Sequence, residues 1–253
     1  MRYSIFKAAW ALPVLAVSTF AHAEMSQWSL GVAAAYSPAV YKDTPSDRTV
    51  IPLIGYEGEH LFLRGFTAGY RLFPMGSDHN IVFRLAYDPR TLKPEDSDDP
   101  QIRLLDKRKS TVLGGVSYQM RTFVGMWEAS VGADVAGRHD GMYAEIAWRL
   151  PLRFDNWGIT PAIGYSYNSD KLNNHLYGVS AEESARSGLA EYEADWDGQY
   201  FIGATAYWSV TRSIRVSGGI RYSNLDGDLS ASPVVGRDTS TMGTLGIAYV
   251  FQT

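Results

Sequence analysis

The sequence predicts an all-β protein, an antiparallel transmembrane β-barrel of ten to twelve strands. Three observations carry this prediction. Apolar side chains alternate with small or polar ones in segment after segment. The charged residues of these segments fall on the face opposite the apolar one. The chain ends on a further alternating strand, in which Leu245, Ile247, Tyr249 and Phe251 share a face, and such a strand suits the closing edge of a barrel.

The start of the chain has the pattern of a cleaved secretory signal peptide over residues 1–23. Arg2 and Lys7 give the first residues a positive charge, an apolar run covers residues 8–20, and Ala21-His22-Ala23 is an A-x-A cleavage pattern. The run is shorter than the roughly 20 residues that a membrane-spanning helix needs. We therefore expect residues 24–253 to form the mature barrel, and the loss of Arg2 and Lys7 changes the formal net charge from −4 to −6.

The composition excludes several classes of protein. A negative net charge does not suit a nucleic-acid partner. The absence of cysteine means that an exported chain must hold together without disulfides. The 24 Gly, 16 Tyr, 10 Phe and 7 Trp suit closely packed strands flanked by aromatic girdles.

Alternation is clearest in residues 157–168 and 213–223, where one face is apolar and the other small or polar. The same pattern covers residues 28–36, 81–87, 123–135, 142–152 and 200–210. These lengths are close to the roughly 9 to 11 residues of a tilted membrane strand. Trp157 opens one strand and Tyr165 and Tyr167 close it, which places aromatic residues at both ends of the lipid-facing band.

The charges of these strands share the face that should point into the lumen. They are Arg84, Glu128, Asp134, Glu145, Arg149, Arg215 and Arg221. Charges facing the lumen cost little, whereas Arg or Lys facing lipid costs about 2 to 4 kcal/mol near the bilayer midplane. A soluble β-sandwich would have to bury the same arginines in its core. This distribution favours the membrane barrel.

Loop lengths predict the orientation. Short connections near residues 119–122, 154–156 and 211–212 are assigned to the periplasm, and long polar ones at 88–108, 169–197 and 224–240 to the exterior. Eleven candidate strands result, although a bacterial barrel normally has an even number. Ten strands remain if residues 50–56 belong to a loop. There are twelve if this segment pairs with residues 61–73 and a further strand is hidden elsewhere, and parity alone favours ten.

The segment YGVSAEESARSGLAEY at residues 177–192 predicts a short helix. Ser180 and Glu183 have the spacing of a capping box, and Gly188 suits the helix end. Two interpretations are open, a helix folded over the barrel mouth and an epitope that binds a partner. The candidate residues for either role are Tyr177, Gly178, Glu183, Ser184, Arg186, Ser187 and Gly188.

A second candidate contact is the run Asp106, Lys107, Arg108 and Lys109 at the rim. Adjacent cations at a strand mouth attract phosphates, so the run suits an acidic partner or lipopolysaccharide. The alternative is that Asp106 and Arg108 pair locally and fix their loop to the rim.

Five segments carry a family resemblance. They are residues 177–192, LLDKRKSTVLGGVSY at 104–118, IGYEGEHLFLRG at 54–65, ASPVV at 231–235, and the closing strand. From residue 54 to the end of the chain these segments span nearly the whole mature sequence. They resemble the MltA-interacting protein family, also called the MipA/OmpV family. The closing strand also resembles the carboxy-terminal signature of outer-membrane barrels, except that Gln252 and Thr253 follow Phe251.

The resemblance implies a non-enzymatic protein of the Gram-negative outer membrane that crosses it as a multi-pass β-barrel and has no catalytic residues or cofactor. It also implies a scaffold role in peptidoglycan growth, in which a lytic transglycosylase and a penicillin-binding protein are brought together. The expected partners are therefore these two enzymes, outer-membrane lipid and the barrel assembly machinery.

Two other functions are open. A narrow channel for small solutes is the main alternative, because inward charges line the lumen of a small barrel. An enzyme is less consistent with the sequence, since the mature histidines, His60, His79, His139 and His175, all lie in predicted turns or loops with no serine partner nearby in sequence. Without cysteines or histidine pairs at ligand spacing, we expect no metal site.

Overall fold

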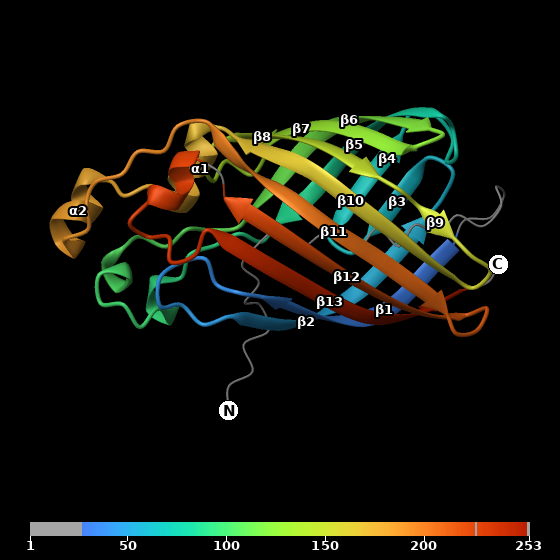
Figure 1. The fold of residues 1–253 in the computed structure, drawn as a ribbon, viewed down its shortest axis with the longest axis horizontal. Coiled ribbons are helices and arrows are strands. Elements are labelled where there is room, and N and C mark those ends of the chain that lie inside the picture. Colours follow the sequence, from blue (N-terminus) through green and yellow to red (C-terminus); the bar gives the residue numbers. More distant parts are fainter. Residues whose placement is uncertain (1–26, 226, 252–253) are drawn as a thin grey trace.

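A computed structural model describes residues 27–225 and 227–251, and in this part the chain forms a closed, all-antiparallel barrel (Figure 1). The expected signal peptide, and Gln252 and Thr253, lie outside the described residues. None of the described helices is long and apolar enough to cross a membrane.

Thirteen β segments make up the barrel wall. They are β1 (Gln27–Ser37), β2 (Asp47–Glu57), β3 (Leu61–Arg64), β4 (Thr67–Arg71), β5 (His79–Asp88), β6 (Thr111–Thr122), β7 (Gly125–Asp134), β8 (Met142–Arg149), β9 (Leu152–Arg153), β10 (Trp157–Asn168), β11 (Asp197–Ser209), β12 (Ile214–Leu225) and β13 (Thr239–Val250). β8 and β9 pair with successive parts of β10 and form one strand interrupted before β9. The interruption contains Pro151, which has no backbone N–H to donate. The barrel therefore has twelve strands.

The terminal strand closes the barrel against the first one, as predicted. β13 pairs with β1 from Ser29 opposite Val250 to Tyr36 opposite Gly243. Beyond the strand, the backbone N–H of Phe251 donates to the carbonyl of Trp28 at 2.9 Å. Closure leaves no exposed sheet edge at this seam, which is the requirement for backbone in lipid.

The strand count resolves in favour of twelve, and the preference for ten was wrong. Residues 50–56 belong to β2, which turns through Gly58 into the next segment. The further strand is not elsewhere in the chain, where we expected it, but inside residues 61–73, where Gly65, with φ of 58°, breaks the segment into β3 and β4. A left-handed backbone conformation costs glycine little, so two short strands form where the pattern suggested one long strand.

Another difference concerns a short turn. We expected it near residues 119–122, but β6 continues through this segment to Thr122 and the turn is Phe123-Val124. Gly125 closes it with φ of 125°. Gln119 and Arg121, which lie within the predicted turn, are inward-facing strand residues and line the lumen.

The side chains of the wall alternate as predicted. In β1 the outward set is Trp28, Leu30, Val32, Ala34 and Tyr36, and all are exposed. Aromatic residues mark both ends of this band: Trp28 packs on Tyr56 at one level, with ring centroids 4.8 Å apart, and Tyr36 lies at the other. This arrangement matches the lipid-facing belt of an outer-membrane barrel.

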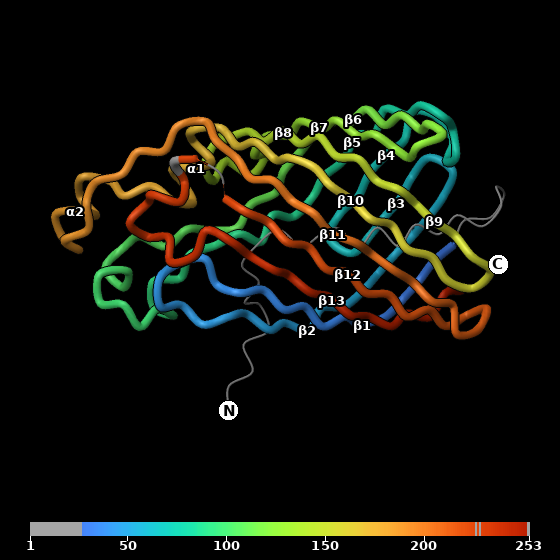
Figure 2. The backbone as a smooth tube through the Cα atoms, viewed as in Figure 1, coloured from blue at the N-terminus to red at the C-terminus, as the bar shows by residue number. Residues whose placement is uncertain are grey.

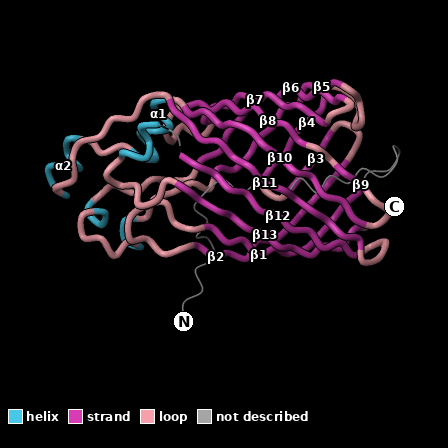
Figure 3. Tube along the Cα trace, viewed as in Figure 1, coloured by secondary structure: helices cyan, strands magenta, loops and turns pink. Residues whose placement is uncertain are grey.

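All helices that the structure describes lie at the end of the barrel that carries the long loops (Figure 3). They are α1 (Asp170–Tyr177), α2 (Ala181–Ser187) and three 3-10 turns at Pro94–Asp96, Ile102–Leu104 and Gly227–Ala231. By the rule that outer-membrane barrels keep short turns in the periplasm and long loops outside, this end faces the exterior.

Gly31 tests the closing seam. A Cβ atom at Gly31 would lie 2.1 Å from the carbonyl oxygen of Ile247 on β13, so Gly31→Ala forces β1 and β13 apart. We expect it to destabilise the barrel by about 1 to 3 kcal/mol, measured by urea unfolding in detergent micelles. Gly243→Ala is the control, because a Cβ atom at Gly243 would have no heavy atom within 4 Å. Equal stability of the two variants would contradict the seam geometry.

Candidate functional site

Four long loops meet over the exterior end of the barrel and form a packed unit, here called the cap. It comprises residues 38–46, 89–110, 169–196 and 227–238, which lie together at one end of the barrel (Figure 2). Its apolar core contains Val40, Tyr41, Leu92, Ile102, Leu105, Leu172, Leu176, Tyr177, Val179, Leu189, Ala194, Leu229, Val234 and Val235, and it continues onto the wall through Leu225 and Met242. Loops with a shared core of this kind form a structured lid over the barrel.

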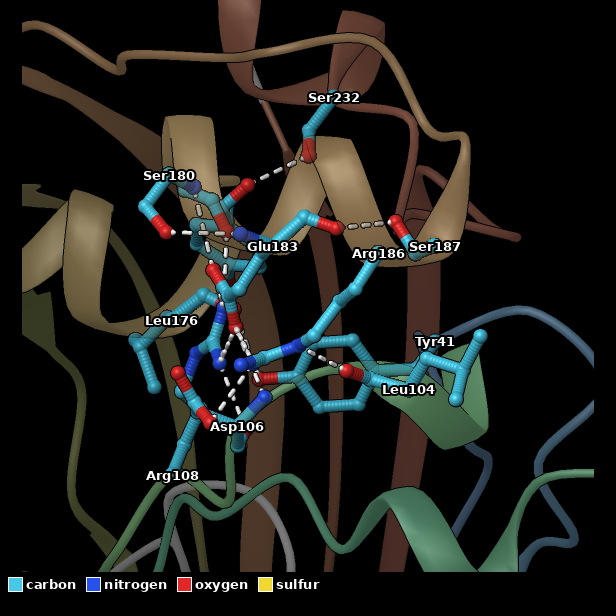
Figure 4. Close-up of polar contacts among 12 residues, drawn as sticks. Tyr41, Leu104, Asp106, Arg108, Leu176, Ser180, Glu183, Arg186, Ser187 and Ser232 are labelled. Carbon is cyan, nitrogen blue, oxygen red and sulfur yellow. Dashed lines mark hydrogen bonds and ion pairs between the residues drawn. The ribbon is translucent and has the colours of Figure 1, made fainter. Parts of the chain in front are cut away.

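An ion pair between Arg108 and Glu183 joins two loops of the cap (Figure 4). Nη1 of Arg108 lies 2.6 Å from Oε1 of Glu183, and Nη2 lies 3.2 Å from Oε2. Nη2 also donates to the carbonyl of Gly178 at 2.8 Å. Both side chains are almost fully buried, at 8% and 5% exposure. A bidentate pair with further hydrogen bonds is the arrangement that makes a buried charge tolerable.

Glu183 also caps the N-terminus of its own helix, α2. Its backbone N–H donates to the Ser180 hydroxyl at 3.2 Å, and its carboxylate accepts from the Ser180 backbone N–H at 3.1 Å. The predicted capping box is therefore confirmed, and Gly188, with φ of 76°, ends α2 as predicted. Burial raises the pKa of Glu183, but the hydrogen bonds from Arg108 and from the backbone of Asp106 and Ser180 outweigh it and hold the pKa below its ordinary value.

The rim run does not pair as the local alternative expected. Arg108 reaches Asp106 only at its backbone carbonyl, at 2.6 Å. The Asp106 carboxylate instead pairs with Arg186 of α2 at 2.7 Å. Lys107 lies in an exposed pair with Glu95 at 3.6 Å. The reason is the tertiary packing of α2 against this loop, which supplies partners from about 80 residues further along the chain.

The predicted loop residues are divided between the core of the cap and its surface. Tyr177 and Glu183 are buried, and Ser187 is buried with its hydroxyl donating to the Glu183 carbonyl at 2.6 Å. Ser184 donates to the Leu189 carbonyl at 2.6 Å. Arg186 remains exposed. Most of the unusual sequence of this segment is therefore used to pack it into the cap.

Other loops contact the end of α1 through side chains that sequence reasoning missed. The Tyr41 hydroxyl donates to the Leu176 carbonyl at 3.0 Å, and the Ser232 hydroxyl to the Tyr177 carbonyl at 2.6 Å. The last carbonyls of a helix have no partner within it, so these contacts satisfy them. Burial raises the pKa of Tyr41 and keeps its hydroxyl protonated as a donor. No local sequence pattern announces such contacts between distant loops.

Below the cap, the barrel encloses a cavity of about 680 Å³. A chain of ion pairs lines it: Arg84 pairs with Glu128, Arg149 lies 2.6 Å from Glu128 and 3.4 Å from Glu145, and Arg221 lies 3.6 Å from Glu145. These five residues belong to the predicted lumen set, and all five line the cavity. Because arginines and glutamates alternate along this chain of pairs, each charged side chain lies beside one of opposite charge inside the barrel.

The other two residues of the lumen set have different contacts. The Asp134 carboxylate accepts hydrogen bonds from the backbone N–H groups of Ala136, His139 and Asp140 and shapes the β7–β8 loop. Arg215 lies with its guanidinium 5.1 Å from the Tyr207 ring and does not line the cavity.

A second cluster of charged residues in the lumen was not identified from the sequence. Arg64 and Arg71 both pair with Glu57, the latter at 2.8 Å, and both guanidiniums lie 4.6 Å from the ring of Phe62. Glu57 lies just beyond the candidate segment 50–56, but it is the last residue of β2. Its period-2 spacing from the inward residues Ile51 and Leu53 was the signal that could have revealed it.

The histidines contact neighbouring groups at the two ends of the barrel. His60 forms a hydrogen bond with the carbonyl of Arg71 at 2.8 Å, and His79 forms one with the hydroxyl of Tyr118 at 2.7 Å. His139 and His175 pack against each other beside the cap, with ring centroids 5.1 Å apart. In the described residues, no group of three or more His, Cys, Asp or Glu is arranged to hold a metal ion.

Arg108→Met tests the ion pair that joins the loops. The change leaves the Glu183 carboxylate buried without its main partner, which costs about 3 to 5 kcal/mol, so the cap should open more often. Trypsin cleavage within residues 169–196 of the folded barrel should accelerate strongly. Lys107→Met is the matched control, because its pair with Glu95 is exposed and surface pairs contribute little. Similar cleavage rates for the two variants would show that the Arg108 pair does not hold the cap closed.

The cap should also loosen in acid. Burial lowers the pKa of both His139 and His175 below the ordinary value of 6.5, so the closed cap holds them neutral. An opened cap binds protons that the closed one does not, and stability is therefore lost as the pH falls below about 6.5. Glu183 acts in the same direction at lower pH, because its stabilising charge is lost as pH falls through its lowered pKa.

Amide hydrogen exchange of residues 170–196, corrected for the intrinsic exchange rate, measures this loosening between pH 7 and 5. The double variant His139→Gln with His175→Gln should flatten the pH dependence above the range in which Glu183 titrates. A pH profile that is unchanged in this variant would exclude the histidines as its cause.

Comparison with known proteins identifies the family. The family model of the MltA-interacting protein MipA matches residues 30–251. The MltA-interacting protein of Escherichia coli strain K12 is 34% identical over 233 residues, which covers 91% of this chain and 92% of that protein. The protein YiaT of the same strain, named as an outer membrane protein, is 30% identical and covers 96% and 97% of the two chains. A solved outer-membrane channel from Pseudomonas putida F1 is similar over 89% and 95% of the chains, with a TM-score of 0.44 and 10% identity. The chain belongs to the MltA-interacting protein family and is a twelve-stranded barrel of the outer membrane.

Proposed function

We propose that the protein is an outer-membrane scaffold that brings a murein-cleaving transglycosylase together with a murein-synthesising penicillin-binding protein. The name of the relative in Escherichia coli, MltA-interacting protein, supports a transglycosylase as one partner. The second enzyme is the partner that the scaffold role of the family implies. In this proposal the barrel is an anchor with no chemistry of its own.

The observation that carries this proposal is the exposed apolar surface at the short-turn end. Phe123, in the turn between β6 and β7, is 100% exposed. Val124 beside it and Leu72, Phe73 and Phe154 in other short turns are also more than 40% exposed. Murein lies in the periplasm, so an enzyme acting on it meets this end of the barrel. Exposed apolar side chains grouped at one end are a feature of interaction surfaces.

The geometry of the cap favours the same end. Its apolar residues are buried in a shared core, and its unusual charged residues pair with one another across loops. Less of this surface is left for a partner than the sequence suggested. The short turns are small, but several of them together form a ring that a partner domain can contact at once.

Pull-down from envelope extracts with the intact barrel tests the proposal. The wild type should recover a lytic transglycosylase and a penicillin-binding protein, and Phe123→Ser combined with Phe154→Ser should reduce recovery by at least tenfold, because hot-spot aromatics often contribute about 2 kcal/mol or more. Leu104→Ser is the control, an exposed apolar residue at the cap end. Recovery of neither enzyme by the wild type would contradict the scaffold proposal. A loss of recovery with Leu104→Ser alone would show that the partner contacts the exterior end of the barrel.

The second candidate is a narrow channel, and the lumen cavity with its ion pairs is the observation that favours it. A straight route for solutes would have to pass the cap, whose buried core contains Leu172 and Tyr177 at 1% exposure each. The packed cap makes the scaffold the better supported of the two functions.

A further inference from the structure

The barrel wall has a gap on one side of β2. On its other side β2 pairs with β1 over its whole length, from Gln27 opposite Glu57 to Ser37 opposite Asp47. Toward β3 it pairs only through Gly55, Tyr56 and Glu57. A final hydrogen bond joins the Gly65 N–H to the Ile54 carbonyl at 2.9 Å. Among the strands that the structure describes, none pairs with Val50 or Pro52 on this side.

The gap arises because the β3–β4 hairpin is short. The hairpin lies toward the short-turn end of the barrel (Figure 1) and turns back at Gly65. On its far side, the last contact with β5 is the hydrogen bond from the Tyr87 N–H to the Phe66 carbonyl at 3.1 Å. Above the hairpin, no described strand fills the wall between β2 and the end of β5.

The loops close the gap from above. The Asp98 N–H donates to the Asp43 carbonyl at 2.9 Å, and the Ser97 hydroxyl to the Lys42 carbonyl at 2.9 Å. The gap is therefore a window with four sides: β2, the Gly65-Phe66 turn, the end of β5, and the cap.

The window lies at the depth of the lipid. Tyr36 of the exterior girdle is opposite Arg48, and Trp28 of the periplasmic girdle is opposite Tyr56. Val50 and Pro52 lie between these levels, in the half nearer the exterior, and Val50 is 71% exposed. Unpaired backbone is not tolerated against hydrocarbon unless it lines a cavity or meets a polar group. This window therefore needs water or a ligand beside it.

Pro52 fits the edge of such an opening. The Ile54 carbonyl points toward the hairpin, and residues two apart on a strand direct their backbone groups to the same side. Pro52 has no N–H to leave unsatisfied there. Proline within a sheet is normally confined to unpaired edges for this reason.

The lumen cavity reaches this window. Its lining includes Ile51, Pro52 and Leu53 from the free edge of β2, and Phe66 and Tyr87 from the opposite side. The Phe66 and Tyr87 rings pack 5.9 Å apart and form an aromatic border to the opening.

The chemistry of the lining selects an amphipathic anion. The described lining residues include eight arginines and three carboxylates, Asp88, Glu128 and Glu145. A fourth carboxylate, that of Glu57, pairs with the lining residues Arg64 and Arg71. Arginines therefore outnumber carboxylates two to one here, although the whole chain carries a net charge of −4. Apolar side chains such as Phe62, Val82 and Phe201 line the same space. A small hydrophilic anion would gain nothing from contact with these apolar side chains, and a neutral lipid would not pair with the arginines.

Arg84 is placed to hold the charged group. It lies two residues from Ala86 on the inward face of β5, and Ala86 is opposite Thr67 at the base of the window. Arg84 pairs with Glu128, but its Nε atom is buried and has no hydrogen-bond partner in the described structure. A buried donor without an acceptor is costly, and a carboxylate oxygen would satisfy it.

We propose that the window is a lateral portal between the outer leaflet and the lumen, and that it takes up a single-chain amphipathic anion of the fatty-acid type. The carboxylate lies among the lumen arginines, with Arg84 as a direct contact, and the acyl chain extends toward the window past Leu53. The cavity of about 680 Å³ is within the range of small-molecule sites, roughly 300 to 1,000 Å³. This binding function goes beyond the scaffold and does not depend on it.

Site-directed fluorescence tests the portal, and the lack of native cysteine makes labelling specific. Leu53→Cys places a bimane at the window, and Thr205→Cys places one on the lumen side of β11, which is paired on both sides. In liposomes, phospholipids with a nitroxide on the acyl chain should quench the label at residue 53 and not at residue 205. Nitroxide-labelled stearate should quench both, because a free single chain enters the cavity.

Each outcome of this experiment decides part of the proposal. If phospholipid quenches neither position or both equally, there is no selective opening at β2 and the portal is wrong. If labelled stearate fails to quench residue 205, the window does not lead to a ligand cavity.

Arg84→Gln tests the anion contact. It should weaken stearate binding about tenfold, as expected for the loss of a charge-assisted hydrogen bond, while phospholipid quenching at residue 53 is unchanged. Arg215→Gln is the control, since Arg215 is also an inward arginine but does not line the cavity. Stearyl alcohol should bind more weakly than stearate to the wild type. Equal affinities of the two variants, or of acid and alcohol, would overturn the anionic ligand.

Discussion

Every level of this structure depends on one constraint: backbone N–H and C=O groups inside a bilayer must find partners within the protein. The twelve-stranded ladder meets it over most of the wall by closing β13 on β1, and the exception is the edge of β2 beside the short β3–β4 hairpin. Once the ladder is closed, the alternation of strands sends one set of side chains to lipid and the other to the lumen. The inward set can then be charged, and the ion pairs of Glu128 and Glu145 with three arginines make those charges tolerable.

Outside the bilayer the constraint is weaker, and the cap is stabilised differently. Its loops pair their backbones only at scattered points, such as Lys42 with Val234. Side chains from one loop satisfy further carbonyls of another, as Tyr41 and Ser232 do for the end of α1. A shared apolar core supplies the driving force. The buried Arg108–Glu183 pair adds geometric specificity more than net stability, since charge burial offsets much of its attraction.

The parts of the fold governed by local periodicity were predictable, and the parts governed by contacts between loops were not. Period-2 alternation located most strands and the barrel closure, and the Ser180–Glu183 spacing located α2. The same periodicity merged β3 with β4, because Gly65 interrupts an otherwise acceptable pattern. It could not reveal the partners of Arg108 or Asp106, which lie about 80 residues away and are fixed only when the loops pack.

The short β3–β4 hairpin is where these two kinds of order conflict. A longer hairpin would have extended the ladder of β2 and satisfied its backbone, yet Gly65 ends β3 after four residues. The neighbouring strand carries Pro52, which could not have donated to a longer β3. Two residues on different strands, Gly65 and Pro52, thus each favour the unpaired edge. The positively charged, partly apolar cavity lies directly behind this edge. An accidental defect would not require matching residues on both sides, whereas an opening with a function would.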